Sequence, residues 1–136
     1  MLLDATGGWA AGASDVLQAS GHRAADRPVN VQFHAPGLDG RYKNRRAEMW
    51  FGLAEWVKRG GWLPNLPELI AELTTPTYTF LNGKFQLEPK EQVKARLGRS
   101  PDLADALALT FAVPEVVKLA VARPERYQPK RPSWAV

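Results

Sequence analysis

Residues 100–109 read Ser-Pro-Asp-Leu-Ala-Asp-Ala-Leu-Ala-Leu. Ser100 is a favoured helix N-cap, and Pro101 suits the first helical position, where a backbone N–H has no partner to lose. Asp102 and Asp105 are three residues apart, so we expect both carboxylates on one face of the first helical turn. Since the other positions are Ala and Leu, the sequence predicts a helix that is otherwise buried.

Two interpretations of this acidic helix start are open. Carboxylates at the start of a buried helix need cations to offset their desolvation, and a divalent metal would supply them. Alternatively, both acids interact favourably with the helix dipole at a solvated N-terminus. Residues elsewhere in the chain are needed to distinguish a metal site from a solvated helix start.

Composition is typical of one globular domain. The 136 residues are 45% hydrophobic and 24% charged, enough for a single core. The chain has no cysteine, which excludes disulfides and thiolate metal sites, and the loop-like surroundings of His22 and His34 indicate no histidine-rich site. No apolar run is long enough to cross a bilayer, and no signal peptide opens the chain. The net charge of +4 is compatible with a polyanionic partner.

The N-terminal part has the pattern of a βαβ unit. Met1-Leu2-Leu3-Asp4 predicts the end of a buried strand with an acid at its carboxyl tip. An Ala-rich helix is expected over residues 9–19, and residues 29–33 alternate as a second strand does. This spacing favours a parallel strand pair. The turn at residues 6–8 lacks the glycine and lysine pattern of a phosphate-binding loop.

The remainder predicts helices around a hairpin. A long helix is expected over residues 43–59, shorter ones over 66–73, 89–97 and 102–113, and an apolar segment over 116–121. Asn82-Gly83 between β-forming residues predicts a two-residue hairpin turn. Three prolines and several basic residues indicate an irregular arm over residues 123–136.

Asp4 is a third candidate ligand. Ligands of open α/β sheets collect outside the carboxyl ends of the strands, where Asp4 is expected. Together with Asp102 and Asp105 it would form an oxygen-only site suited to Mg²⁺ or Mn²⁺, with the carboxylates of Asp4 and Asp105 within about 8 Å. Two such ions can hold the attacking and leaving oxygens of a phosphoryl displacement. Locally, Asp4 could instead cap the next helix; Asp15 is a weaker candidate ligand.

Basic side chains are concentrated in three segments near these acids. Together with interleaved aromatic residues they could form a groove that follows a nucleic-acid backbone, although each alone is as well explained as a solubilising residue. Lys90 stands out because it opens the helix that leads to the acidic one. The candidate DNA-binding residues are Arg41, Lys43, Arg45, Lys84 and Lys90.

Taken together, these motifs resemble the C-terminal nuclease domain of tailed-phage large terminase subunits. The similarity covers residues 2–113 in the family's order, and the block around Ser100 is its most specific part. The other matching segments are Asp4-Ala5-Thr6-Gly7-Gly8, residues 42–50 (YKNRRAEMW), residues 76–80 (PTYTF) and residues 84–87 (KFQL).

The resemblance implies an RNase H-like fold and a two-metal endonuclease that cuts concatemeric viral DNA during head packaging. Asp4 would be the acid that ends the fourth strand, Asp105 the acid on the last helix, and Asp102 a further ligand or a group just behind the ligands. Mg²⁺ or Mn²⁺ would be the cofactor and double-stranded DNA the substrate. The portal and the small terminase subunit would be partners, in the cytoplasm of a bacterial host cell, with no membrane contact.

The chain also departs from the family. The family's first metal-bridging aspartate lies on a strand upstream of anything present here, and the ATPase domain is missing. We therefore expect a partial RNase H-like α/β domain over residues 1–122, with a mixed sheet, flanking helices and an added β-hairpin, followed by the arm at 123–136.

Three functions are compatible with this pattern. The first is a metal-dependent endonuclease domain, impaired as an isolated fragment. The second is a non-catalytic prophage remnant that binds DNA or a packaging partner, and the third is an unrelated α/β protein with a structural acidic helix. In each case the strand at residues 1–4 would lack a neighbour, and its open edge could mediate homo-oligomerisation.

Overall fold

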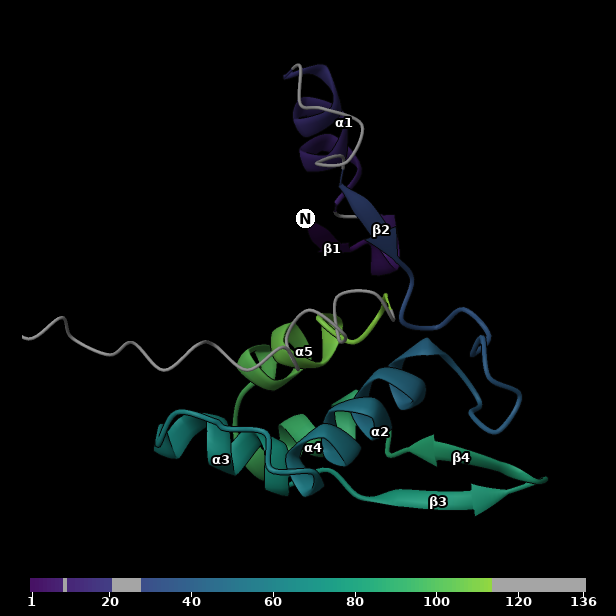
Figure 1. The fold of residues 1–136 in the computed structure, drawn as a ribbon, viewed down its shortest axis with the longest axis vertical. Helices are drawn as coiled ribbons and strands as arrows, with labels where there is room; N and C mark the ends of the chain where they lie inside the picture. Colours follow the sequence, from purple (N-terminus) through teal and green to yellow (C-terminus); the bar gives the residue numbers. More distant parts are fainter. Residues whose placement is uncertain (9, 21–27, 114–136) are drawn as a thin grey trace, which may run out of the picture.

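The first part of the structure is a parallel strand pair joined by a helix. The computed structural model describes residues 1–8, 10–20 and 28–113. Strand β1 (Leu2–Asp4) pairs in parallel with β2 (Val29–Val31), and α1 (Ala11–Ala19) connects them (Figure 1). This confirms the predicted βαβ unit, and Asp4 lies at the carboxyl end of β1, opposite Val31.

Strand β2 ends earlier than the predicted residue 33. The backbone N–H of Phe33 donates to the side-chain oxygen of Thr6 (3.0 Å), and the Phe33 carbonyl accepts from the N–H of Arg46 (3.0 Å). These bonds satisfy the Phe33 backbone outside the strand ladder, while its side chain stays buried in the core.

The long helix α2 (Arg45–Lys58) forms the centre of the remaining structure. Asn44 adopts an extended conformation and its side chain accepts the N–H of Ala47 (2.9 Å), as an N-cap does. The buried face of α2 includes Met49, Trp50 and Leu53. Because this apolar face packs on α5 (Asp102–Leu109), the helix forms the main wall of the core.

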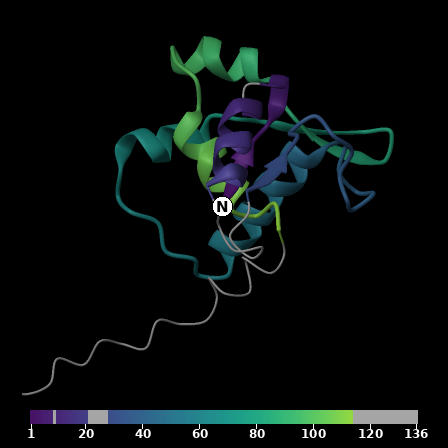
Figure 2. The ribbon, with the colours of Figure 1, turned by 90° about the horizontal axis from the view of Figure 1, so that it is seen from above.

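A hairpin and two short helices complete the fold. Helix α3 (Pro67–Thr74) precedes the hairpin of β3 (Tyr78–Leu81) and β4 (Lys84–Leu87), and α4 (Lys90–Leu97) follows it. Asn82 and Gly83 both have positive φ (53° and 74°), the conformation that a two-residue hairpin turn requires. The hairpin projects from the helices in Figures 1 and 2, and in the described residues it forms a sheet separate from β1–β2.

Helix α5 begins at Asp102, as the predicted range has it, but the residues before it do not cap it as expected. Pro101 (φ −80°, ψ 57°) is the flanking residue and Asp102 is the first helical one. Ser100 does not cap this helix; its hydroxyl donates to a carboxylate oxygen of Asp102 (2.5 Å). The prediction that Ser100 caps the helix and that Pro101 starts it is therefore wrong.

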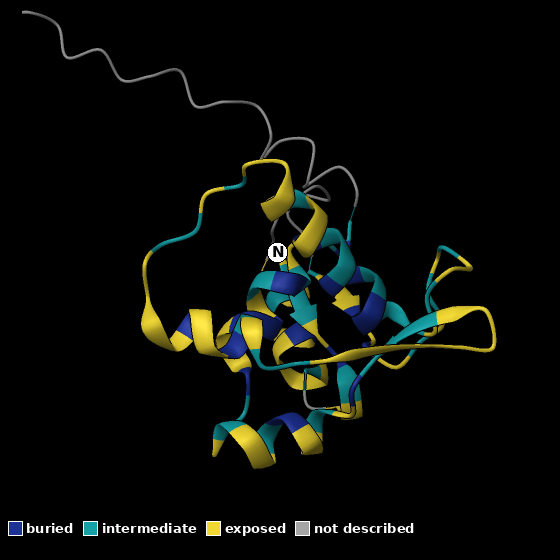
Figure 3. Cartoon of the chain, turned by 90° about the horizontal axis from the view of Figure 1, so that it is seen from below, coloured by how far each residue is buried: buried dark blue, intermediate teal, exposed yellow. Residues whose placement is uncertain are grey.

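The core lies where α5 meets α2, α3 and β1. Ala104 and Ala108 of α5 are completely buried, since their small side chains let the neighbouring elements approach closely. In Figure 3 the buried positions gather where the helices pack together, whereas most of the hairpin is exposed. Apolar side chains from β2, from the segment directly after it, and from α2 and α3 complete this cluster: Val31, Phe33, Met49, Trp50, Leu53 and Leu69. Helix α5 is therefore central to the packing as well as to the candidate site.

Candidate metal centre

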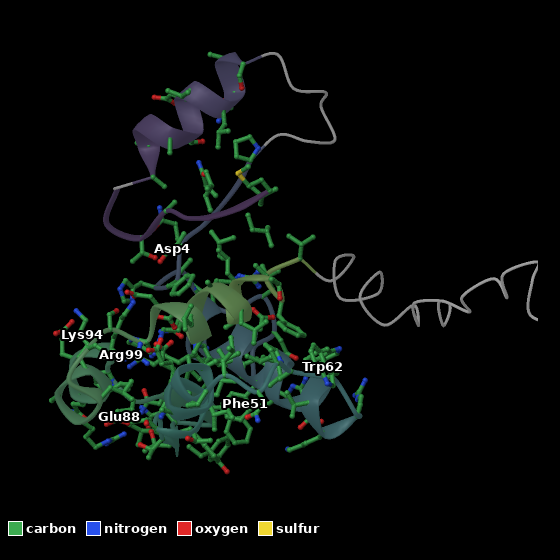
Figure 4. All side chains as sticks on the ribbon, turned by 90° about the vertical axis from the view of Figure 1, so that its left-hand side faces the viewer. Asp4, Phe51, Trp62, Glu88, Lys94 and Arg99 are labelled. Atoms are coloured by element: carbon green, nitrogen blue, oxygen red, sulfur yellow. The ribbon has the colours of Figure 1, made fainter. Side chains whose placement is uncertain are left out.

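One pocket brings together the three predicted acids. A pocket of about 160 Å³ is lined by Asp4 from the end of β1, by Asp102 and Asp105 from the first turn of α5, and by Lys90 from the start of α4. Phe33, Ala106 and Leu109 supply the apolar part of its wall. Figure 4 shows Asp4 at the boundary between the β1–α1–β2 part and the helices. Residues remote in sequence thus meet at one carboxyl strand end, where ligands of α/β sheets collect.

The two acids of α5 differ strongly in environment. Asp105 is 5% exposed, and one of its carboxylate oxygens, Oδ1, accepts from the indole N–H of Trp50 (3.0 Å). The side chain of Asp102 is 78% exposed. Both carboxylates lie on the side of α5 that lines the pocket, as predicted, but Asp105 is buried at the core side and Asp102 is exposed at the rim.

Lys90 connects these two acids. Its ammonium nitrogen lies 2.8 Å from Oδ2 of Asp105 and 3.7 Å from Oδ1 of Asp102. The Lys90 ammonium is the described cation closest to Oδ2, but its orientation does not meet the geometry of a hydrogen bond. No other donor among the described residues forms a hydrogen bond to Oδ2. Lys90 therefore compensates the charge of Asp105 from the pocket side.

Arg46 compensates the same carboxylate from the core side. Its guanidinium is buried, with Nε 3.5 Å from Oδ1 of Asp105 and Nη1 donating to the carbonyl of Glu88 (3.0 Å). It also lies over the ring of Trp50, 5.6 Å from the centroid. The sequence pattern presents Arg46 only as one of the basic side chains of the candidate groove and does not predict its burial; the available signal was its position directly before Ala47, at the start of a mostly apolar helix.

Asp4 is the accessible ligand candidate. Its side chain is exposed and accepts the backbone N–H of Thr6 (2.9 Å), so the predicted local turn contact is present as well. This bond engages Oδ1 and leaves the second oxygen for a ligand in the pocket. Asp15, the weaker candidate, is exposed on α1 and does not line the pocket.

The predicted DNA-binding residues fall into two groups. Lys43 and Lys84 are exposed, and Arg41 is exposed while paired with Asp39 (2.7 Å). Arg45 is largely buried, because its guanidinium pairs with Glu48 (2.5 Å) and donates to the carbonyl of Ala112. Two guanidinium nitrogens of Arg45 are thus engaged within the chain, whereas Arg41, Lys43 and Lys84 are exposed.

The donor chemistry of the pocket fits a hard divalent cation. Carboxylate oxygens are the ligands that Mg²⁺ and Mn²⁺ prefer. Asp4 and Asp105 each present an oxygen without a hydrogen bond to the described residues. However, across segments 1–8, 10–20 and 28–113, no three acidic or histidine side chains are close enough to form a complete ligand set. The residues therefore suit a metal, with part of its coordination left to water or to another ligand.

Two further features bear on the predictions. In the part of the chain that the structure describes, no helix is long and apolar enough to span a membrane. The predicted apolar segment at 116–121, the domain boundary at 122 and the arm at 123–136 lie outside the described residues. His22 also lies outside them, whereas His34 is exposed in the loop after β2.

Known proteins resemble this chain in structure and not in sequence. No family model and no curated protein matches the sequence. Solved structures of the nuclease domain of the large terminase subunit gp2 of bacterial virus Sf6 do match. A point mutant of that domain with manganese superposes with a TM-score of 0.59 at 23% identity, covering 82% of this chain and 64% of that one. A calcium-bound form gives a TM-score of 0.57 at 24% identity.

The domain without the mutation gives a TM-score of 0.52 at 26% identity, again covering 82% of this chain and 64% of that chain. This chain therefore spans less than two thirds of the domains it matches. At this level of identity the similarity establishes the architecture. The described part of the chain has a partial α/β, RNase H-like fold, that of the nuclease domain of a phage large terminase subunit.

Proposed function

We propose that this chain is a metal-dependent DNA endonuclease domain of a phage packaging terminase, with Asp4, Asp102 and Asp105 as its catalytic and metal-binding residues. The observation that carries the proposal is the pocket where acids from β1 and α5 meet at the carboxyl end of a strand. Mg²⁺ or Mn²⁺ bound there would polarise a phosphodiester and activate a water molecule. The solved nuclease domains with manganese and calcium support a divalent cation.

The chain's own residues have separate tasks in this proposal. Asp4 offers an accessible carboxylate, and Asp105 offers one oxygen from a rigid, buried side chain. Asp102 at the exposed rim completes the negative charge of the pocket. Lys90 balances this charge and can approach a phosphate oxygen, since its ammonium lies between the two acids of α5.

Double-stranded DNA is the proposed substrate. Lys43 and Lys84 are exposed basic residues, and Tyr78 and Phe80 expose more than half of their surface on the neighbouring hairpin. Lysines bind the phosphate backbone, and aromatic faces can stack on bases. By the same resemblance we propose the portal and the small terminase subunit as partners in the host cytoplasm.

Metal binding and DNA cleavage together test the proposal. The full chain should bind Mn²⁺, Asp4→Asn should abolish the binding, and Asp15→Asn on exposed α1 is the matched control. We expect little or no Mg²⁺- or Mn²⁺-dependent nicking of supercoiled plasmid, because the described acids form no complete ligand set. DNA binding without Mn²⁺ binding would favour the alternative, a non-catalytic remnant. Strong nicking that survives Asp4→Asn would contradict the assigned site.

A further inference from the structure

A side chain from α3 closes the N-terminus of α5. The first N–H groups of a helix have no partner within it, and a cap side chain commonly accepts the N–H of the second or third residue. In α5 the third residue is Ala104, and its N–H donates to Oε2 of Glu72 (2.9 Å). Pro101, which precedes the helix, provides no side-chain bond, so Glu72 acts as a cap from another helix.

Glu72 is a completely buried carboxylate, which needs a counter-ion to remain charged. Arg99, in the connection between α4 and α5, pairs with its other oxygen. A second nitrogen of Arg99 donates to the carbonyl of Glu68 (3.3 Å), one turn earlier on α3. This pair ties α3, Arg99 and the start of α5 together, and a negative charge is favourable at this end of a helix dipole.

The capped turn is the one that carries the acids. Ala104 lies between Asp102 and Asp105, and the N–H of Asp105 makes the first intrahelical bond to the Pro101 carbonyl (2.9 Å). Glu72 does not line the pocket, so it contacts this turn from the core side. Fixing the backbone of the turn from behind fixes the direction in which both carboxylates leave the helix.

We propose that Glu72 is a positioning residue for the metal centre. It sets the rotation of the first turn of α5, and Arg99 serves as its counter-ion. The expected effect on metal affinity rests on the proposed function. The cap itself can be tested without any metal.

The experiment compares three variants of the full chain. Glu72→Leu combined with Arg99→Leu replaces the pair with apolar groups that can preserve packing but cannot cap. Glu72→Gln keeps one oxygen that can accept the N–H of Ala104. Glu91→Gln, which breaks an exposed pair with Lys94 on α4, is the control. The readouts are amide hydrogen exchange at Ala104 and Mn²⁺ affinity by electron paramagnetic resonance, with circular dichroism to establish folding.

We expect the double Leu variant to fold, to exchange the Ala104 amide about fivefold faster or more, and to bind Mn²⁺ about tenfold more weakly. Glu72→Gln should recover part of both effects, and the control should match the parent. Unchanged exchange at Ala104 in the double Leu variant, or normal Mn²⁺ affinity despite faster exchange, would overturn the positioning role. If the parent binds no Mn²⁺, the proposed function and the metal consequence fail together, and exchange alone decides the cap.

Discussion

Replacement of Asp105 by Ala should destabilise the fold itself, whether or not the pocket binds a metal. The carboxylate is buried between the guanidinium of Arg46 and the ammonium of Lys90, and it accepts the indole N–H of Trp50. Arg46 is only 6% exposed, and its Nε and Nη2 have no hydrogen-bond acceptor among the described residues. Asp105 is therefore the main charge that balances this buried cation.

The magnitude follows from this arrangement. Removing one partner of a buried ion pair costs about 3–5 kcal/mol, because the other charge stays buried without compensation. The substitution also leaves the indole N–H of Trp50 without an acceptor. Because Trp50 belongs to the same cluster, this cost is already part of the range of about 3–5 kcal/mol and is not counted separately. Against a typical stability of about 5–15 kcal/mol, Asp105→Ala would remove a large part of the free energy of unfolding.

Urea unfolding followed by tryptophan fluorescence and circular dichroism measures this loss. Asp102→Ala is the matched control: its side chain is 78% exposed on the same helical turn, and we expect a change within about 0.5 kcal/mol. If Asp105→Ala unfolded within about 0.5 kcal/mol of the parent, the inferred charge balance with Arg46 would be refuted. The nuclease activity of Asp105→Ala therefore has to be corrected for the fraction of the variant that is folded.

Three further predictions concern metal, acid and self-association. Mn²⁺ at a hundredfold excess over its Kd should stabilise the fold by about 2.7 kcal/mol and raise the Tm; an equal rise in Asp4→Asn would show that the metal binds elsewhere. The hydrogen bond from Arg96, aided by bonds from Thr77, lowers the pKa of Glu88 from its ordinary 4.5. The ionised Glu88 carboxylate therefore stabilises the fold fully above pH 4.5, and this stabilisation is lost as the pH falls through the lowered pKa. Glu88→Gln should therefore flatten the acid limb of Tm against pH, and an unchanged limb would contradict this. Since β1 pairs only with β2 in the described residues, sedimentation across a concentration series should reveal association through its open edge, and a monomer at every concentration would contradict it.

The sequence predicted well the features that depend on local pattern. The Asn82-Gly83 pair predicted the hairpin, because few residue pairs adopt positive φ so readily at both central positions of a two-residue turn. The rule that strand ends collect ligands placed Asp4 beside the acidic helix, although the two segments are far apart in sequence. Helix limits were predicted within a few residues, except that α5 ends at Leu109 and not near residue 113.

Features that depend on tertiary contacts were missed. Ser100 fits the statistical preference for an N-cap, but α5 starts one residue further along, after Pro101, and Glu72 of α3 accepts the N–H of its third residue, Ala104. The signal was present: Glu72 lies three residues after buried Leu69, hence on the apolar face of α3. A charged residue at such a position needs a partner, but only the fold identifies Arg99 as that partner.

The two oxygens of Asp105 divide structural and functional roles between them. Oδ1 accepts from Trp50 and faces Arg46 in the core, whereas Oδ2 faces Lys90 at the pocket. Asp105→Asn separates the roles, because its amide oxygen can keep the bond to Trp50 while its NH₂ group replaces the ligand oxygen. This variant should therefore unfold at a higher urea concentration than Asp105→Ala and still bind no Mn²⁺. Equal stability of the two variants would mean that the negative charge, and not the Trp50 bond, is what holds this side chain in place.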